Sequence, residues 1–286
     1  MGDDANADRT LRGMTNDGAF RVVTARTTEL VAEAVARQSA GVGCAEAFGE
    51  VLTGAILVRE TMAPSQRLQA LFATRDRRGR LVADTHPDGT TRGLVTLKEG
   101  VADLDVAGGS LEMMRTLHNG ELHRGVVEVP EGGGVSQALM TYMSASEQVA
   151  TMIAVACVME GERVAAAGGY IVQLLPEVGT APLAVMTERL RDFETIGPLL
   201  ETTDANPSKL LDELLWGMEF TRLDESPVAF GCQCSTVRVL ASLATVGRDE
   251  LERMIADGEV LDIDCDYCGQ GYRVSPNQLR GLLEQS

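Results

Sequence analysis

The sequence has few aromatic side chains and lacks a long apolar run. Phe, Tyr and Trp make up 4% of its 286 residues, while 44% of the residues are hydrophobic. The core must therefore be built mainly from Ala, Val, Leu and Met. Because no apolar run approaches the length of a membrane span, we expect no membrane partner. The length allows two or three domains with at least one substantial core.

Positive charge is also scarce. The 25 Lys and Arg residues face 42 Asp and Glu residues, and the net charge of −17 would repel a phosphate backbone, so we expect no nucleic-acid partner. The first twenty residues include Asp3, Asp4, Asp8 and Asp17 and have no apolar signal-peptide segment. This favours the cytoplasm, a reducing compartment in which a cysteine cluster normally binds metal or senses redox state.

Features of common enzyme sites are missing. The three histidines, His86, His118 and His123, each lie in a polar, turn-like stretch without zinc-ligand spacing to a cysteine, so we interpret them as exposed and non-catalytic. Ser146-Glu147-Gln148 has no nucleophile elbow around its serine, and a structural or interface role is expected. No Gly-x-x-x-x-Gly-Lys-Ser/Thr segment is present. We therefore do not expect an enzyme.

Four of the six cysteines form two close pairs in the last quarter of the chain. Cys232-Gln-Cys234 and Cys265-Asp-Tyr-Cys268 are separated by thirty residues, which is the arrangement of a four-thiolate zinc site. Cys265-x-x-Cys268 has the usual knuckle spacing, and Gly269 lets the backbone turn so that amides can point at the sulfurs. The pattern predicts one Zn²⁺ bound by all four cysteines.

Three interpretations of these four cysteines are open at this point. Spacing alone favours a permanent structural zinc. A disulfide framework is the weakest, because a secretory signal is missing. The third is a switch, in which zinc holds the thiolates until an oxidant converts them into disulfides. The other two cysteines, Cys44 and Cys157, stand alone in apolar surroundings and are predicted to be buried, inert thiols.

Residues 1–178 are predicted to form one α+β domain. After a polar, frayed segment at 1–17, helices are expected at 28–38 and 45–60, and a third at 136–143. Gly49 and Gly54 inside the second helix each cost about 1 kcal/mol relative to Ala, which indicates close packing against another element. The predicted strands are 20–25, 68–73, 81–84, 91–97, 110–117, 125–129, 152–158, 163–166 and 170–175.

Residues 179–229 are predicted to be a helical linker. One helix is indicated by Leu183, Met186, Leu190 and Phe193. Asn206-Pro207 begins a second, whose apolar face is Leu211, Leu214, Leu215 and Met218, with Trp216 beside it. Two amphipathic helices must dock on something. They are either ordinary core helices, which periodicity alone favours, or a metastable clasp that the zinc module holds closed.

Residues 230–286 are predicted to be a small zinc module. Short helices are expected at 235–245 and 248–256, a strand at 260–264, and a capping box, Ser275-Pro276-Asn277-Gln278, before a final helix. Because the module has few large apolar residues, zinc binding, worth about 10–16 kcal/mol in small zinc peptides, would supply much of its folding free energy. Loss of the metal should then unfold the module.

These motifs resemble those of the redox-regulated chaperone family called heat-shock protein 33, over nearly the full length of the chain. In the zinc module they are Phe230-Gly-Cys232-Gln-Cys234-Ser235, Gly247-Arg-Asp-Glu-Leu-Glu252 and Cys265-Asp-Tyr-Cys268 with Tyr272. In the first domain they are Leu81-Val-Ala-Asp84, Gly125-Val-Val-Glu128, Ser146-Glu147-Gln148 and Gly168-Gly169-Tyr170-Ile-Val-Gln173-Leu-Leu-Pro176.

Two stretches depart from the family pattern. Arg75 to Arg80 (RDRRGR) replaces the glycine-containing turn expected after the first strands. Leu122-His123-Arg124 stands where the family tends to have Tyr-Gln. We expect the fold to survive both changes, because the neighbouring strand positions Phe72, Met113 and Met114 stay apolar.

The resemblance implies an ATP-independent holdase that binds unfolding client proteins during oxidative stress. In the reduced, inactive protein, Cys232, Cys234, Cys265 and Cys268 would hold zinc. Oxidation would form the Cys232–Cys234 and Cys265–Cys268 disulfides, release zinc, unfold the linker helices and expose apolar surface. A homodimer of the active form, through the first domain, is also expected from the family.

Two other functions compete with this one. A thiol-disulfide oxidoreductase would use Cys265-x-x-Cys268, but such pairs normally begin a helix beside a βαβ unit. The second competing function is a static zinc module for assembly or nucleic-acid contact, and the net charge of −17 argues against contact with nucleic acid.

Overall fold

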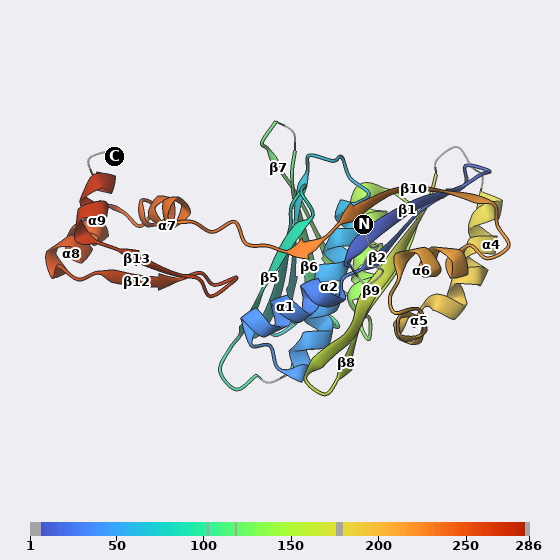
Figure 1. Cartoon of the computed structure of the whole chain (residues 1–286), viewed down its shortest axis with the longest axis horizontal. Coiled ribbons are helices and arrows are strands. Elements are labelled where there is room, and N and C mark those ends of the chain that lie inside the picture. The colour runs from blue at the N-terminus through green and yellow to red at the C-terminus, as the bar shows by residue number, and fades with distance from the viewer. Residues whose placement is uncertain (1–6, 102, 118, 176–179, 284–286) are drawn as a thin grey trace. The chain divides into compact units, whose positions relative to one another are not determined.

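The computed structural model describes residues 7–101, 103–117, 119–175 and 180–283 (Figure 1). The chain divides into two compact units, Met1–Gly231 and Cys232–Ser286, which we call unit 1 and unit 2. Helices and strands are mixed in both units, which confirms the predicted α+β class. No helix of the described residues is long and apolar enough to cross a membrane.

Unit 1 contains a five-stranded antiparallel sheet, sheet A. Side chains alternate between the two faces of a strand. In β2, Val23 and Ala25 belong to one apolar core, and Phe20 and Val22 belong to another. Sheet A is therefore covered on both faces. Its strands run in the order β10 (Phe220–Pro227), β1 (Arg9–Thr15), β2 (Phe20–Arg26), β9 (Arg163–Leu174) and β8 (Thr151–Glu160).

A six-stranded sheet, sheet B, lies in the same unit. A hairpin connects β4 and β5 through Asp88-Gly89, with Gly89 at a φ of 83°. β11 pairs with β5 in parallel, directly before the first cysteine pair. The order of the strands is β11 (Ala229–Phe230), β5 (Thr90–Leu97), β4 (Gly79–Thr85), β3 (Arg67–Ala73), β6 (Ser110–Thr116) and β7 (Leu122–Glu128).

Three helices contact both sheets: α1 (Thr28–Gln38), α2 (Val42–Arg59) and α3 (Val135–Tyr142) (Figure 1). α2 is buried on nearly all sides, as expected for a helix that is apolar all round. Gly49 allows its close approach, because a Cβ there would lie 2.6 Å from Cys157 Sγ and 2.8 Å from Val31 Cγ1. A Cβ at Gly54 would overlap Leu139. The close packing predicted at both glycines is confirmed.

The linker segment covers the other face of sheet A. Its elements are α4 (Thr180–Leu190), the 3-10 turn η2 (Arg191–Phe193), α5 (Gly197–Thr203) and α6 (Pro207–Leu214) (Figure 1). Asn206 caps α6 and Pro207 is its first residue, as predicted. Instead of two helices there are three, because Pro198 lies in the first turn of α5 and starts a new helix as well as ending the previous one.

Unit 2 has a small apolar core, in which Leu251, Val274 and Leu279 are buried. The predicted capping box is confirmed, since the amide of Ser275 donates to Gln278 Oε1 at 2.9 Å and the amide of Gln278 donates to Ser275 Oγ at 3.4 Å. The described elements are α7 (Thr236–Leu243), α8 (Arg248–Asp257), β12 (Leu261–Asp264), β13 (Gly271–Val274) and α9 (Pro276–Leu283).

The frayed segment predicted at 1–17 is wrong from residue 9 onward, because Arg9–Thr15 forms β1 between β2 and β10. Just before it, Asp8 is buried and accepts hydrogen bonds from Arg26 at 2.9 Å and from the amide of Leu30 at 2.7 Å. Polar residues such as Thr10 occupy buried positions of β1, so the alternating apolar pattern of a strand is hidden.

Strands were missed or divided at two further places. Phe220–Pro227 forms β10 within the segment predicted as a helical linker. The two strands predicted at 163–166 and 170–175 are one continuous strand, β9. Gly168 and Gly169 lie inside β9, between the two predicted segments, where a Cβ would meet the backbone oxygens of Ala25 and Ala154 at 2.5 Å.

The prediction that the histidines are exposed is wrong for His86. Its side chain is buried, with Nε2 3.6 Å from Asp84 Oδ2, and burial lowers its pKa, so it stays neutral at pH 7. His123 is half-buried, and His118 lies outside the described residues.

Glu147 belongs to the segment Ser146-Glu147-Gln148, for which a structural or interface role was predicted. Its carboxylate accepts hydrogen bonds from Arg115 at 3.0 Å and from the Tyr142 hydroxyl at 2.8 Å.

Gly49→Ala should destabilise unit 1 by about 1–3 kcal/mol through overpacking, even though alanine favours a helix by about 1 kcal/mol. Its methyl group would overlap Cys157 and Val31. Urea unfolding followed by circular dichroism measures the change. The matched control is Gly281→Ala in α9, where a Cβ meets nothing within 4 Å, and it should be neutral or slightly stabilising. Unchanged stability of Gly49→Ala would contradict the tight packing.

Candidate metal centre and linker surface

Four sulfur atoms from two distant segments meet in unit 2. Cys232 and Cys234 lie on the extended stretch before α7, and Cys265 and Cys268 lie on the turn between β12 and β13. The four sulfurs all lie within 4.8 Å of one another. Those of Cys232 and Cys265 are 3.7 Å apart, and those of Cys234 and Cys268 are 3.4 Å apart. All four cysteines singled out in the sequence are thus brought together.

The spacing of the sulfurs fits a tetrahedral metal ion. Zn²⁺ binds thiolates at about 2.3 Å, which corresponds to sulfur–sulfur edges of about 3.8 Å. The two closest sulfur pairs lie near that length. Soft thiolate ligands suit zinc, whereas calcium and magnesium require oxygen ligands. The cluster could therefore hold one metal ion of the zinc type.

The turn around Cys265 is built to hold negatively charged sulfurs. The backbone amides of Tyr267 and Cys268 donate hydrogen bonds to the Cys265 sulfur, and the amide of Gln270 donates to the Cys268 sulfur. Gly269 has a φ of 70°, a left-handed conformation that glycine adopts without strain. The arrangement of amides predicted for this knuckle is confirmed.

Two thiols of this cluster, Cys265 and Cys268, resist ionisation. Burial raises the pKa of Cys268 to about 12, and hydrogen bonds with the other three sulfurs add to the effect. Burial likewise raises the pKa of Cys265. A bound metal reverses this balance, because a coordinating thiol is deprotonated outright. A bound cation would therefore favour the thiolate forms of Cys265 and Cys268, which burial alone disfavours.

Tyr272 supports the cluster from β13. Its hydroxyl donates a hydrogen bond to Cys234 Sγ at 3.0 Å, and that bond raises the pKa of Tyr272, so the hydroxyl keeps its proton at neutral pH. The antiparallel register, in which Tyr272 lies opposite Ile263, brings the ring to the cysteine end of the hairpin. In the sequence, Tyr272 belongs to the motif that contains Cys265 and Cys268, but residue spacing predicts no role for its hydroxyl.

The two remaining cysteines lie in unit 1, apart from the cluster. Cys44 is fully buried and Cys157 is 6% exposed, which confirms the prediction of buried thiols. Burial raises the pKa of both, that of Cys157 to about 12, so neither is a reactive thiolate at neutral pH. Among the described residues, the four cysteines form the one group of side chains placed to hold a metal ion, and it includes no histidine.

The contact between the linker and sheet A is a second candidate functional surface. The Thr24 hydroxyl donates to the Pro207 carbonyl at 2.8 Å, and the Tyr170 hydroxyl donates to the Phe193 carbonyl at 3.3 Å. Arg222 of β10 donates to Ser208 Oγ at 3.2 Å and pairs with Asp212 of α6. Most of the remaining contact is apolar. The linker contributes the buried residues Met186, Leu190, Ile196, Leu200, Leu210, Leu211, Leu214 and Leu215, and sheet A contributes Leu11, Phe20, Val22, Ala154, Ala166, Tyr170 and Val172.

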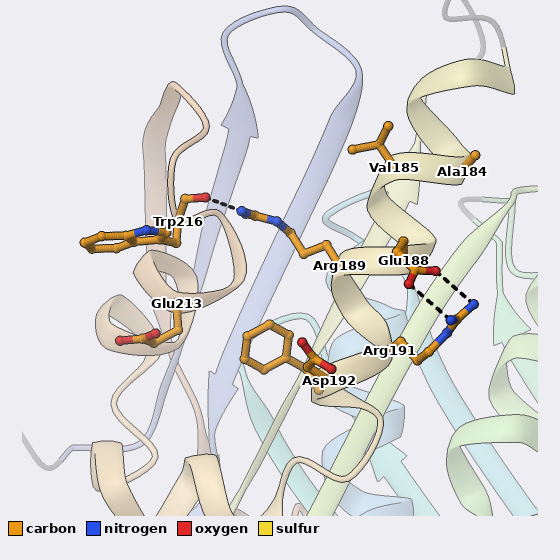
Figure 2. A pocket seen from close by; sticks show the side chains of 9 residues that line it. Ala184, Val185, Glu188, Arg189, Arg191, Asp192, Glu213 and Trp216 are labelled. Carbon is orange, nitrogen blue, oxygen red and sulfur yellow. Dashed lines mark hydrogen bonds and ion pairs between the residues drawn. The ribbon is translucent and has the colours of Figure 1, made fainter.

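Arg189 ties α4 to the end of α6. Its guanidinium donates to the carbonyl oxygens of Leu214, at 3.2 Å, and of Trp216 (Figure 2). A hollow of about 840 Å³ lies beside these contacts, and the Trp216 side chain in it is 75% exposed. Val185 is 69% exposed. One face of the linker is therefore buried against sheet A, while apolar side chains on its outer face are exposed to solvent.

Comparisons with known proteins now identify the family. The family model described as Hsp33 protein matches residues 8–275. The chain belongs to the Hsp33 family. Its relatives include 33 kDa chaperonins from Syntrophotalea carbinolica, 32% identical over 96% of this chain and 99% of the relative, and from Thermus thermophilus, 30% identical over 97% and 87%. Membership of the Hsp33 family supports a chaperone and confirms the resemblance found in the sequence.

A solved structure of an Hsp33 homologue has the same fold. The crystal structure of the 33 kDa chaperonin from Thermotoga maritima is similar with a TM-score of 0.84 at 22% identity, and the match covers 98% of each chain. The predicted fold class is thus confirmed by comparison as well as by the elements themselves.

Tyr272→Phe should weaken zinc binding about tenfold, because a hydrogen bond to a metal ligand, here from the Tyr272 hydroxyl to Cys234, holds that ligand in its orientation. Competition with a chromogenic zinc chelator at pH 7 measures the affinity. Arg273→Gln, the next residue on β13, is the matched control and should bind zinc normally, since Arg273 pairs only with Asp262 at an exposed position in the described structure. Equal affinity of both variants would show that the Tyr272 hydroxyl does not support the cluster.

Proposed function

We propose that this protein is a redox-regulated, ATP-independent holdase of the cytoplasm, whose reduced, zinc-bound form is inactive. The observation that carries the proposal is the meeting of four cysteine sulfurs within 4.8 Å in a unit with a small apolar core. Family membership supports the chaperone part. The partners would be unfolding or aggregation-prone client proteins.

In the reduced protein, Cys232, Cys234, Cys265 and Cys268 would hold one Zn²⁺. Bound zinc would keep the sulfurs deprotonated at neutral pH and supply much of the folding free energy of unit 2. The apolar core of that unit is too small to replace this contribution. The fold of unit 2 would therefore depend on the state of its sulfurs.

Oxidation would convert the four sulfurs into two disulfides. In each pair, two zinc-bound thiolates would give two electrons to one H₂O₂, which takes up two protons from the solvent and is reduced to two water molecules as the S–S bond forms. Hypochlorous acid could act as the same two-electron oxidant, and it would take up one proton and yield water and chloride. Disulfide sulfurs carry no negative charge, so the four residues would no longer hold the metal.

We propose the pairs Cys232–Cys234 and Cys265–Cys268. In the folded cluster the distances of 3.7 and 3.4 Å connect one motif to the other, so distance alone does not favour pairing within a motif. Once unit 2 loosens, closing a loop of 33 or 34 residues costs more entropy than closing a loop within one motif. Peptide mapping of the oxidised protein by mass spectrometry distinguishes the two pairings.

Loss of structure in unit 2 would release the linker. Continuity of the chain supports this coupling, because β10 pairs with β1, β11 pairs with β5, and β11 ends at Phe230, two residues before Cys232. Release of the helices would expose the apolar face of sheet A, which could then bind apolar segments of clients. The active form is further proposed to be a homodimer through the first domain.

A thiol-disulfide oxidoreductase is less well supported than a holdase. Cys265 and Cys268 lie on a hairpin turn and not at the start of a helix beside a βαβ unit, which is the usual position of such a redox pair. We therefore expect that this protein does not catalyse the reduction of insulin.

Treatment of the reduced protein with H₂O₂ at raised temperature should release about one zinc per chain. Sulfurs that have formed disulfides carry no negative charge, so they no longer hold the metal. A chromogenic chelator reports the zinc, and suppression of client aggregation is followed in the same samples. Both signals should rise together, and a dithiol with added zinc should reverse both.

The control for this titration is Cys44→Ala, which leaves the cluster intact and should respond like the unchanged protein. Zinc that stays bound, or equal holdase activity in the reduced and oxidised forms, would leave a static zinc module and rule out the switch.

Gly13→Val should open the linker without altering a cysteine. A Cβ at this position of β1 would lie 2.9 Å from Leu211 Cδ2, and the extra methyl groups of valine would push α6 from sheet A. The reduced, zinc-loaded variant should show partial holdase activity and faster proteolysis within 197–218. Gly41→Val, where a Cβ meets nothing within 4 Å, is the control and should stay inactive. An inactive Gly13→Val with a protected linker would contradict the role of this contact.

A further inference from the structure

A basic hollow lies on the face of sheet B that α1, α2 and α3 do not cover. The strand register places Thr96, Arg80, Ala73, Ser110 and Glu128 in one row across this face, and the next row contains Leu71 and Val126. The hollow has a volume of about 420 Å³. Its walls come from β3 to β7 and from the turn between β3 and β4, so residues distant in sequence meet there.

Five cations line the hollow: Arg77, Arg78, Arg80, Lys98 and Arg124. Its lining contains a single acidic residue, Glu112, whose carboxylate is already engaged by Arg124, with one of the two contacts at 2.7 Å. In the described part of the chain, no carboxylate forms an ion pair with the other four cations, although Arg78 donates to the Glu99 carbonyl at 2.9 Å. On a protein with a net charge of −17, this is a local excess of positive charge.

The turn that supplies two of these cations, Arg77 and Arg78, holds Arg77 in an unusual conformation. Its φ is 56°, a left-handed value that costs a residue with a Cβ roughly 1 kcal/mol relative to glycine. The neighbouring Asp76 does not neutralise the hollow. Its carboxylate accepts from the Thr74 hydroxyl at 2.7 Å and the Arg78 amide at 3.0 Å, and it lines a different hollow.

We propose that this hollow binds a compact oligophosphate anion, such as inorganic tripolyphosphate or the triphosphate group of a nucleotide. Guanidinium groups recognise phosphate oxygens with paired N–H donors, and the hydroxyls of Thr96 and Ser110 add two more donors to the lining. The volume suits a small ligand. Residues of both stretches that depart from the family pattern, Arg75 to Arg80 and Leu122 to Arg124, line the hollow.

The lining favours a small phosphate compound over a macromolecule. None of the described lining residues is aromatic, so nucleobases have no ring on which to stack, which is the usual contact of single-stranded nucleic acid. A long polyanion or an acidic peptide would also extend from the hollow over a strongly acidic protein. Only a compact anion gains from the five cations without that repulsion.

The test is isothermal titration calorimetry, in which the full-length, reduced, zinc-loaded protein is titrated in low salt with tripolyphosphate, ATP or adenosine. We expect one site per chain for tripolyphosphate and for ATP, none for adenosine, and weaker binding as salt rises. The zinc chelator reports in parallel that the metal stays bound, which separates binding in the hollow from extraction of zinc. ATP that binds more than tenfold tighter than tripolyphosphate would overturn the assignment to phosphate groups.

Two variants test the residues. Arg80→Gln and Arg77→Gly should each weaken tripolyphosphate binding about fivefold or more, since each removes one charged donor. Arg77→Gly also relieves the left-handed strain, so its thermal stability should equal or exceed that of the unchanged protein, which excludes misfolding as the cause. Arg75→Gln is the matched control. Arg75 lies on the same turn but pairs with Glu131 at 2.7 Å and faces the other hollow, so binding should be unchanged.

Three results would refute the proposal. The first is no binding of tripolyphosphate at millimolar concentration. The second is an equal loss of binding in Arg75→Gln and Arg77→Gly, which would indicate unspecific attraction. The third is tighter binding of an oligonucleotide or of an oligoglutamate peptide than of tripolyphosphate. Each result leaves the holdase proposal untouched, because the hollow shares no residue with the cysteine cluster or with the linker contact.

Discussion

Burial of sheet A on both faces is the constraint on which the rest of unit 1 depends. Val23 and Ala25 of β2 need α1 and α2 on one side, while Phe20 and Val22 need the linker on the other. Exposing apolar surface costs about 25 cal/mol per Å², so neither cover can leave without a large loss of free energy. The linker is thus part of the core of unit 1, although its chain runs directly into unit 2. In the proposed function, this continuity of the chain is the route by which a change in unit 2 would reach the core of unit 1.

Unit 2 is organised on the opposite principle. Its apolar core is small, whereas the sulfurs of Cys232, Cys234, Cys265 and Cys268 gather within 4.8 Å and receive hydrogen bonds from backbone amides and from Tyr272. Such a unit depends on ligand chemistry more than on the hydrophobic effect. In the proposed function, a reagent that changes only the charge of the sulfur atoms would therefore unfold it, whereas unit 1, with its large apolar cores, should withstand the same reagent.

The parts that sequence reasoning predicted correctly are those encoded locally. Cysteine spacing pointed to the cluster, and the apolar period of 28–38 marked α1 to the residue. β1 and β10 were missed because their strand character comes from pairing with each other, and most side chains of β10 are exposed. Tyr272 and the basic hollow depend on sheet register, which brings Arg80 of β4 and Arg124 of β7 to one surface. Residue spacing carries no such information.

The linker is held by two kinds of interaction, and this suggests the order in which it opens. α6 is held by fully buried leucines, whereas β10 is held to β1 mainly by backbone hydrogen bonds, with a break in register between Leu11 and Gly13. Segments with little apolar burial open at the lowest free energy. β10 also lies closer in sequence to the cysteine cluster than the linker helices do, with only β11 between them. Disorder that spreads from unit 2 would therefore enter the linker at its weakest element, and β10 would separate from sheet A before the leucines of α6 lose their contacts.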